Sequence, residues 1–174
     1  MNKIFKIAVV GGESTGKTTL SKALALTYET LVVPEYARDY LLALQSEYTE
    51  SDLIQIAKGQ LSLEEKYTLK ANKLLFLDTD FLVLQLWSEM KFNTCHKYIL
   101  NHLSTNSVGA YILTKPDFDW VYDPLREHPN VRDRQLIFRW YQELILSTNK
   151  ALCIVEGDNE QRLATSKKFI NNLI

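Results

Sequence analysis

The sequence is poor in the residues that mark several specialised protein classes. It has two cysteines, six glycines and four prolines among 174 residues, so its composition is that of an ordinary globular chain. Cys95 and Cys153 lie far apart and form no CxxC pair. This favours reduced cysteines in the core of a cytoplasmic protein, with one long-range disulfide as the alternative. The three histidines lack the spacing of a metal site.

Neither sign of charge dominates, because 20 Lys and Arg residues face 21 Asp and Glu residues. A net charge of −1 predicts neither a nucleic-acid partner nor a membrane partner. No apolar run reaches the roughly 18 residues of a membrane span. The N-terminal MNKIFKIAVV is basic and then apolar, like a signal peptide. Its apolar part is too short and runs directly into a glycine loop, so we predict a strand there.

Short apolar runs alternate with longer amphipathic stretches along the chain. Nearly continuous apolar runs are typical of parallel strands that are buried on both faces. The expected strands are Ile4–Val10, Thr30–Val33, Lys73–Asp78, Gly109–Thr114 and Ala151–Glu156. The expected helices are Lys17–Tyr28, Arg38–Leu44, Ser51–Ala71, Phe81–Lys91, Arg132–Leu146 and Asn159–Leu173. The alternation predicts a single α/β domain over residues 1–174, with a five-stranded parallel sheet and helices on both faces.

The stretch GGESTGKTT matches the Walker A pattern G-x-x-x-x-G-K-[ST]. Its glycines let the backbone turn N–H groups toward a phosphate, and the helix that follows adds the positive end of its dipole. We expect Lys17 to reach the β- and γ-phosphates and the Thr18 hydroxyl to hold Mg²⁺. The predicted nucleotide-binding residues are Gly11, Gly12, Glu13, Ser14, Thr15, Gly16, Lys17, Thr18 and Thr19. The loop predicts a three-layer P-loop NTPase fold, and leaves ATP and GTP as alternatives.

An acidic pair follows the third strand, in LLFLDTD. A carboxylate at the end of an apolar strand is the Walker B pattern, which orders Mg²⁺ and its waters. Asp78 is the predicted metal ligand, and Asp80 is predicted to contact the substrate. The alternative is that Asp78 or Thr79 only caps the helix that begins near Phe81.

The second strand leads into VVPEYARDY. Ligands of parallel α/β sheets bind beyond the carboxyl ends of the strands, so Glu35 is expected at the same edge as the phosphate loop. Glu35 could accept the proton of an attacking hydroxyl, Arg38 could hold a charged substrate group or a phosphate oxygen, and Tyr36 offers a flat face to a ring. The alternative is an ordinary helix start, with Glu35 favoured by the dipole.

The segment after the fourth strand, residues 116–134, is long enough to be a lid. It carries two aromatic and three basic side chains: Trp120, Tyr122, Arg126, Arg132 and Arg134. The arginines could place positive charge on the migrating phosphoryl group, and the two rings could stack on a substrate ring. The alternative is a core tryptophan with solvated arginines. GDNEQR follows the fifth strand, where an adenine would lie, without a base-specific signature.

Taken in order, GGESTGKT, PEYAR, FLDTDF and W-x-x-D-P-L-R resemble the ribosylnicotinamide kinase domain of NadR-type proteins. The resemblance implies an enzyme that uses ATP and Mg²⁺ to phosphorylate the 5′-hydroxyl of nicotinamide riboside in NAD salvage. VVPE also resembles the deoxynucleoside kinases, whose glutamate after this strand is the base, which supports Glu35 by resemblance. No DNA-binding helices or adenylyltransferase domain precede the phosphate loop, so we expect neither NAD synthesis nor repression.

The sequence leaves two other functions open. One is a kinase for another nucleoside or for a nucleotide. The other is a P-loop ATPase or GTPase that acts as a nucleotide-dependent binding or switch module. The expected partner is a small-molecule nucleoside, and a homo-oligomer is left open.

Overall fold

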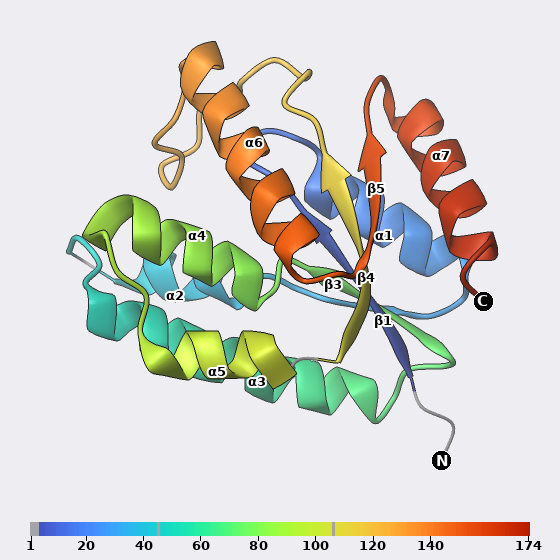
Figure 1. The fold of residues 1–174 in the computed structure, drawn as a ribbon, viewed down its shortest axis with the longest axis horizontal. Coiled ribbons are helices and arrows are strands. Elements are labelled where there is room, and N and C mark those ends of the chain that lie inside the picture. The colour runs from blue at the N-terminus through green and yellow to red at the C-terminus, as the bar shows by residue number, and fades with distance from the viewer. Residues whose placement is uncertain (1–3, 45, 106) are drawn as a thin grey trace.

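A five-stranded parallel sheet forms the centre of the molecule (Figure 1). The structure is a computed structural model that describes residues 4–44, 46–105 and 107–174. The strands are β1 (Phe5–Val10), β2 (Leu31–Val33), β3 (Leu74–Asp78), β4 (Val108–Thr114) and β5 (Ala151–Val155). Their order across the sheet is β2-β3-β1-β4-β5, and all neighbours are parallel.

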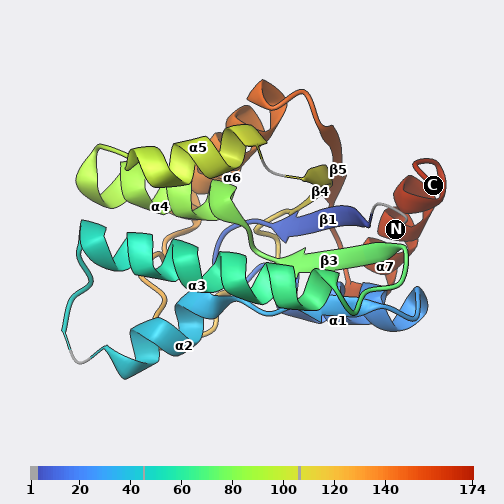
Figure 2. The ribbon, with the colours of Figure 1, turned by 90° about the horizontal axis from the view of Figure 1, so that it is seen from below.

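Helices cover both faces of this sheet, which gives three layers (Figure 2). They are α1 (Lys17–Thr27), α2 (Tyr36–Ala43), α3 (Glu50–Thr68), α4 (Phe81–Phe92), α5 (Lys97–Thr105), α6 (Val131–Ser147) and α7 (Asn159–Asn171). Side chains of α1 and α7 form a core with one face, and those of α4 and α6 form a core with the other. A third core joins α3, α4 and α5 beside the sheet. The predicted three-layer P-loop fold is confirmed.

The central strands β1, β3 and β4 are mostly apolar because both of their faces are buried. Every residue of β3 is buried, and residues Ile7–Val10 of β1 are fully enclosed. At about 25 cal/mol per Å² of buried apolar surface, these central strands contribute a large share of the folding free energy.

The register of the strands fixes where the polar residues meet. Val33 pairs with Leu77, and Val9 pairs with Asp78. The residues that follow β1, β2 and β3 therefore emerge at one edge of the sheet, as expected for parallel strands. This edge carries the phosphate loop, Glu35 and the Asp78–Asp80 pair.

The strands and most helices begin and end within about two residues of their predicted limits, and α3 ends three residues before its predicted limit. The sequence analysis missed α5, which lies between Lys91 and Gly109. Its Ile99 is fully buried against α3 and α4, and Leu103 one turn later also packs on the core. This i, i+4 apolar pair was the available signal. None of the helices in the described ranges has the length and apolar character needed to cross a bilayer.

Candidate active site

The phosphate loop joins β1 to α1 and turns at two glycines. Gly11 has φ 148° and Gly16 has φ 76°, conformations that side chains disfavour. A Cβ on Gly11 would lie 2.3 Å from Thr114 Oγ1, so the loop packs directly on the end of β4. No described side chain caps α1, and its first turn holds no acidic residue. The N–H groups of this helix end therefore suit an anion such as a phosphate.

Lys17 and Thr18 begin α1 and lie close to two different partners. Lys17 Nζ donates to the Gly12 carbonyl at 2.7 Å, which keeps the ammonium group on the phosphate loop. The Thr18 hydroxyl donates to Asp78 Oδ2 at 2.6 Å. This bond joins the end of β3 to the start of α1, as the Walker A and Walker B patterns require.

The other carboxylate oxygen of Asp78 marks a candidate metal position. Asp78 Oδ1 is buried and has no hydrogen-bond partner among the described residues. Burial raises the pKa of Asp78, and the Thr18 hydroxyl and Lys17 oppose that rise. A carboxylate oxygen and a hydroxyl are the hard oxygen donors that Mg²⁺ prefers. Thr18 and Asp78 therefore fit a magnesium ion.

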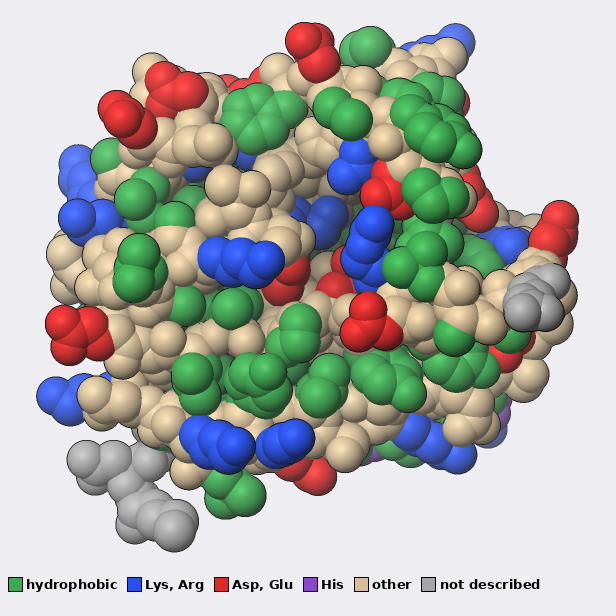
Figure 3. Space-filling model, turned by 180° about the vertical axis from the view of Figure 1, so that it is seen from behind, with side chains coloured by type: hydrophobic (Ala, Val, Ile, Leu, Met, Phe, Trp, Pro, Cys, Tyr) green, Lys and Arg blue, Asp and Glu red, His purple; other side chains and the backbone are tan. Residues whose placement is uncertain are grey.

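A cavity of about 550 Å³ extends from the phosphate loop across the edge of the sheet. All nine residues from Gly11 to Thr19 line it. Glu35, Arg38, Asp80 and Arg126 line it as well, so these predicted residues are brought together. Figure 3 shows the molecule from behind, with a hollow near the middle of that face and acidic and basic side chains around it.

Glu35 is held at the end of β2 by a contact from α3. Gln60 accepts from the Tyr36 N–H at 2.8 Å and donates to the Pro34 carbonyl at 3.3 Å, which fixes the backbone on both sides of Glu35. Burial raises the pKa of Glu35, while the charges of Lys17 and Arg38 lower it. A carboxylate with a raised pKa that shares a cavity with a phosphate loop can accept a proton.

Asp80 is the N-cap of α4, and it is almost fully buried. Its Oδ1 accepts from the Leu82 N–H at 3.1 Å, and its Oδ2 accepts from the Tyr111 hydroxyl at 2.9 Å. Burial raises the pKa of Asp80 to about 7, against the effect of the Tyr111 hydrogen bond. The sequence analysis kept a cap by Asp78 or Thr79 as the alternative, but Asp80 makes this cap, because Asp78 still belongs to β3.

The connection from β4 to α6, residues 115–130, is bonded to the walls of the cavity, and we keep the name lid for it. Arg38 Nη2 forms a 2.7 Å ion pair with Asp123 Oδ2 of the lid. The Ser14 hydroxyl accepts from the Val121 N–H at 3.2 Å. Arg38 therefore binds the lid in this structure as well as lining the cavity. The predicted lid ran to residue 134, but α6 already begins at Val131.

The three predicted arginines lie in three different environments. Arg126 lines the cavity. Arg134 is buried and donates to the carbonyls of Phe118 at 2.9 Å and Ser14 at 3.4 Å, so it joins the lid to the phosphate loop. Burial lowers the pKa of Arg134. Arg132 is exposed on the first turn of α6.

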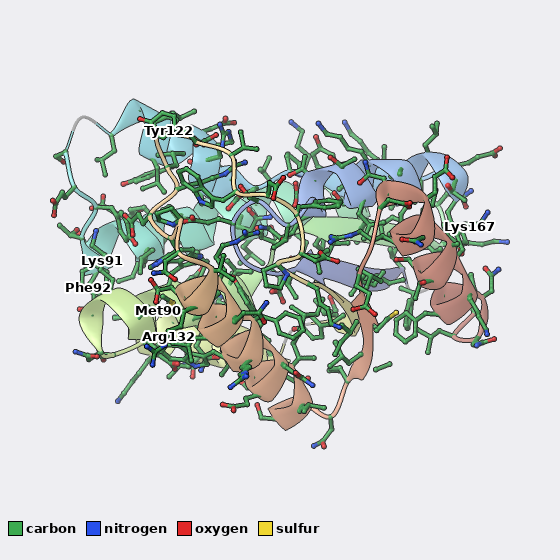
Figure 4. The ribbon with its side chains drawn as sticks, turned by 90° about the horizontal axis from the view of Figure 1, so that it is seen from above. Met90, Lys91, Phe92, Tyr122, Arg132 and Lys167 are labelled. Atoms are coloured by element: carbon green, nitrogen blue, oxygen red, sulfur yellow. The ribbon has the colours of Figure 1, made fainter. Side chains whose placement is uncertain are left out.

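The three predicted stacking residues are not among the side chains that line this cavity. The Tyr36 ring packs on Gly59 of α3, where a Cβ would lie 2.1 Å from the ring. Trp120 and Tyr122 contact each other edge to face, with ring centroids 6.2 Å apart. Tyr122 is 77% exposed and lies at the outer margin of the molecule (Figure 4).

Other aromatic residues line the cavity, and the sequence analysis missed them. Trp87 of α4 stacks on His128 of the lid, with ring centroids 5.6 Å apart. Tyr48 lies on the α2–α3 connection and also lines the cavity. Lys91 Nζ lies 3.6 Å from the centre of its ring. Tyr141 of α6 is fully buried, and burial raises the pKa of its hydroxyl. Trp87 and Tyr141 sit within amphipathic helices, where a core position and a cavity position give the same pattern.

Arg162 of α7 is a second residue that the sequence analysis did not assign. It is 1% exposed, and its guanidinium lies 3.9 Å from the centre of the Phe118 ring. It donates to the carbonyls of Gly157, at 2.8 Å, and Thr15, and it pairs with Asp117. Arg162 thus ties the phosphate loop to the loops after β4 and β5. Its position in GDNEQR, after the fifth strand, was the only available signal.

Comparisons with known proteins show the family and the fold of the chain. A family model described as an AAA domain matches residues 6–162. The Trifunctional NAD biosynthesis/regulator protein NadR of Escherichia coli (strain K12) is 29% identical, over 97% of this chain and 42% of the relative. The chain thus spans less than half the length of that curated relative.

Two solved structures of NadR share the fold. The crystal structure of NadR in complex with NAD and AMP-PNP has a TM-score of 0.71 at 17% identity, covering 96% of this chain and 50% of that one. The structure of NadR in complex with NR has a TM-score of 0.69 at 18% identity, covering 98% and 49%. Because the family model spans most of the chain, this protein belongs to the AAA domain family of P-loop proteins and is homologous to NadR.

Proposed function

We propose that this chain is an ATP-dependent nucleoside kinase whose acceptor is nicotinamide riboside. The observation that carries the proposal is one continuous cavity with two different ends. The phosphate loop forms one end. Glu35, Asp80 and three aromatic residues line the rest, so the cavity offers room and a proton acceptor for a second small molecule beside the γ-phosphate.

The acceptor end suits a flat ring that carries a positive charge. Trp87, Tyr48 and Tyr141 supply aromatic surface, and the carboxyl groups of Glu35 and Asp80 line the same end. The pyridinium ring of nicotinamide riboside is flat and cationic, so it would gain both stacking and cation–π energy. The homologous NadR structures that contain NR and AMP-PNP support the same pair of ligands.

The chemistry follows from how the residues are placed. Lys17 would neutralise charge on the β- and γ-phosphates, and Arg126 would add positive charge from the lid. Glu35 would accept the proton of the 5′-hydroxyl while the hydroxyl oxygen attacks the γ-phosphorus. The bond between the γ-phosphorus and the bridging β-phosphate oxygen breaks, and ADP leaves. Thr18 and Asp78 would hold Mg²⁺, which supplies charge stabilisation to the phosphates when bound. Positioning contributes most, because the transition state is loose.

A panel of acceptors tests the proposal directly. ADP release and product mass would be measured with Mg²⁺, with ATP or GTP, and with nicotinamide riboside, purine and pyrimidine nucleosides, or no acceptor. We expect ATP to be consumed in a 1:1 ratio with nicotinamide mononucleotide formed. Slow hydrolysis that no nucleoside accelerates would refute the kinase and favour a nucleotide-dependent switch.

The metal position has its own test. Thr18→Ala and Asp78→Asn should raise the Mg²⁺ concentration needed for half-maximal rate, because each removes an oxygen donor. Asp133→Asn is the matched control, since Asp133 is exposed on the first turn of α6. An unchanged Mg²⁺ dependence in Asp78→Asn would contradict the Walker B assignment.

A further inference from the structure

Glu13 lies within the phosphate loop, but its carboxylate is bonded to the lid. Glu13 Oε1 accepts from the Glu127 N–H at 2.9 Å, and Oε2 accepts from the His128 N–H at 3.0 Å. Each oxygen of the carboxylate thus takes one of two successive backbone donors. Hydrogen bonds to an ionised acceptor are about twice as strong as neutral ones, so this contact fixes the lid backbone locally.

The chemistry of the loop explains why this carboxylate faces the lid. A carboxylate among N–H groups that bind phosphate would repel the anion that the loop holds. Turned to the lid, the same charge is compensated by the two backbone donors at residues 127 and 128. Glu13 is therefore poorly suited to bind a phosphate and well suited to hold a neighbouring segment.

The two donors directly follow Arg126, the lid arginine that lines the cavity. On the other side of Arg126, Val121 is bonded to the Ser14 hydroxyl, and the Arg126 guanidinium donates to the Val121 carbonyl. Arg126 therefore lies between two points at which the lid is bonded to the phosphate loop. A change at either point would move the guanidinium relative to the phosphates.

We propose that Glu13 is a positioning residue that clasps the lid at residues 127 and 128 and thereby sets Arg126 against the phosphate loop. The expected effect on catalysis rests on the proposed kinase function. The contact between Glu13 and the lid, which we call the clasp, is a property of the protein without ligands. Glu13 contacts neither acceptor nor phosphate in this role. It acts through Arg126.

Hydrogen–deuterium exchange of the full chain without nucleotide tests the clasp. Glu13→Gln keeps the size of the side chain but has one acceptor oxygen in place of two, and Glu13→Ala removes both. We expect amide exchange in peptides covering residues 124–130 to rise about tenfold in Glu13→Gln, since one charge-assisted bond is worth about 1.4 kcal/mol or more. Glu143→Gln on the exposed face of α6 is the control. A thermal melt of each variant would show that the fold is intact.

Kinetics with ATP and nicotinamide riboside test the action through Arg126. We expect Glu13→Gln to lower kcat about tenfold, because a small misplacement of a charged group is costly, with the KM for ATP nearly unchanged. In an Arg126→Ala background the same change should cost less than about twofold, because the group that Glu13 positions is already absent.

The outcomes separate this proposal from the proposed function. Unchanged exchange at residues 124–130 overturns the clasp. A raised KM for ATP with normal kcat overturns the positioning role, because it would make Glu13 a nucleotide ligand. Full additivity with Arg126→Ala overturns the route through Arg126. If the unaltered chain phosphorylates no nucleoside, the proposed function fails, and exchange alone still decides whether Glu13 holds the lid.

Discussion

The two ends of the cavity are built in different ways. The phosphate end consists of nine consecutive residues whose backbone would make most of the contacts to a phosphate, and its shape depends on the positive φ angles of Gly11 and Gly16. The acceptor end is assembled from side chains of α2 and its N-cap Glu35, of α3, α4 and α6, and of the lid. One end is therefore a local motif, and the other exists only once the chain has folded.

This difference determines how each end should respond to substitution. At the phosphate end, Lys17 and the glycines act on charges that every nucleotide triphosphate carries, so a change there should abolish turnover with any acceptor. At the acceptor end, each side chain contributes part of one surface, so single changes should weaken one substrate by limited amounts. Four predictions sharpen or break this comparison.

The largest effect is expected from Lys17→Ala. Its Nζ lies at the phosphate loop, 2.7 Å from the Gly12 carbonyl, where its charge would meet the β- and γ-phosphates. We expect a loss of kcat of about 10³ or more with every acceptor. Lys167→Ala on α7 is the matched control, far from the loop (Figure 4). Appreciable turnover in Lys17→Ala would place the catalytic charge elsewhere.

The next largest effects are expected from the three arginines, whose substitutions should differ in their effect on kcat and stability. Arg126→Ala should lower kcat by about 10³, the lower range for an arginine that stabilises phosphoryl transfer, with little change in ATP affinity. Arg132→Ala should behave nearly as the unaltered chain, because Arg132 is exposed. Arg134→Ala should instead lower the melting temperature, because it leaves the Phe118 and Ser14 carbonyls without this donor. Equal kcat values for Arg126→Ala and Arg132→Ala would show that the lid arginine does not take part in catalysis.

Glu35→Gln should have a smaller effect on kcat, of about 10², because base catalysis is secondary in a loose transition state. Burial raises the pKa of Glu35, and a base works only when ionised. The kcat of the unaltered chain should therefore fall as the pH drops through that raised pKa, at a higher pH than for an ordinary glutamate. In Glu35→Gln this acidic limb should disappear. If Glu35→Gln and the unaltered chain showed the same acidic limb, another group would be the base.

The same contrast shows what sequence could predict. The strands and the phosphate loop were predictable because both depend on neighbours in sequence: continuous apolar runs in one case, glycine spacing in the other. The role of Trp87 was not predictable, because the face that it presents depends on where α4 packs. Trp120 looked like the better stacking residue because it lies in the lid. Arg162 was missed because its partners Thr15, Gly157 and Asp117 come together only through the sheet order.

The smallest effect is expected at the aromatic wall, and it distinguishes Trp87 from Trp120. Trp87 lines the cavity and stacks on His128, whereas Trp120 contacts Tyr122 outside the cavity lining. Trp87→Ala should weaken nicotinamide riboside binding by up to about 2 kcal/mol, or roughly 30-fold, and Trp87→Phe by less. Trp120→Ala should change the affinity little.

Reduced nicotinamide riboside is the matched control ligand for this wall, because it has nearly the same shape without the ring charge. If cation–π attraction operates, Trp87→Ala should cost more for the cationic ligand than for the reduced one, and calorimetry with both ligands measures that difference. Equal losses would leave only the stacking contribution of the indole. A larger loss in Trp120→Ala than in Trp87→Ala would contradict this assignment, and would mean that the lid turns Trp120 into the cavity when the acceptor binds.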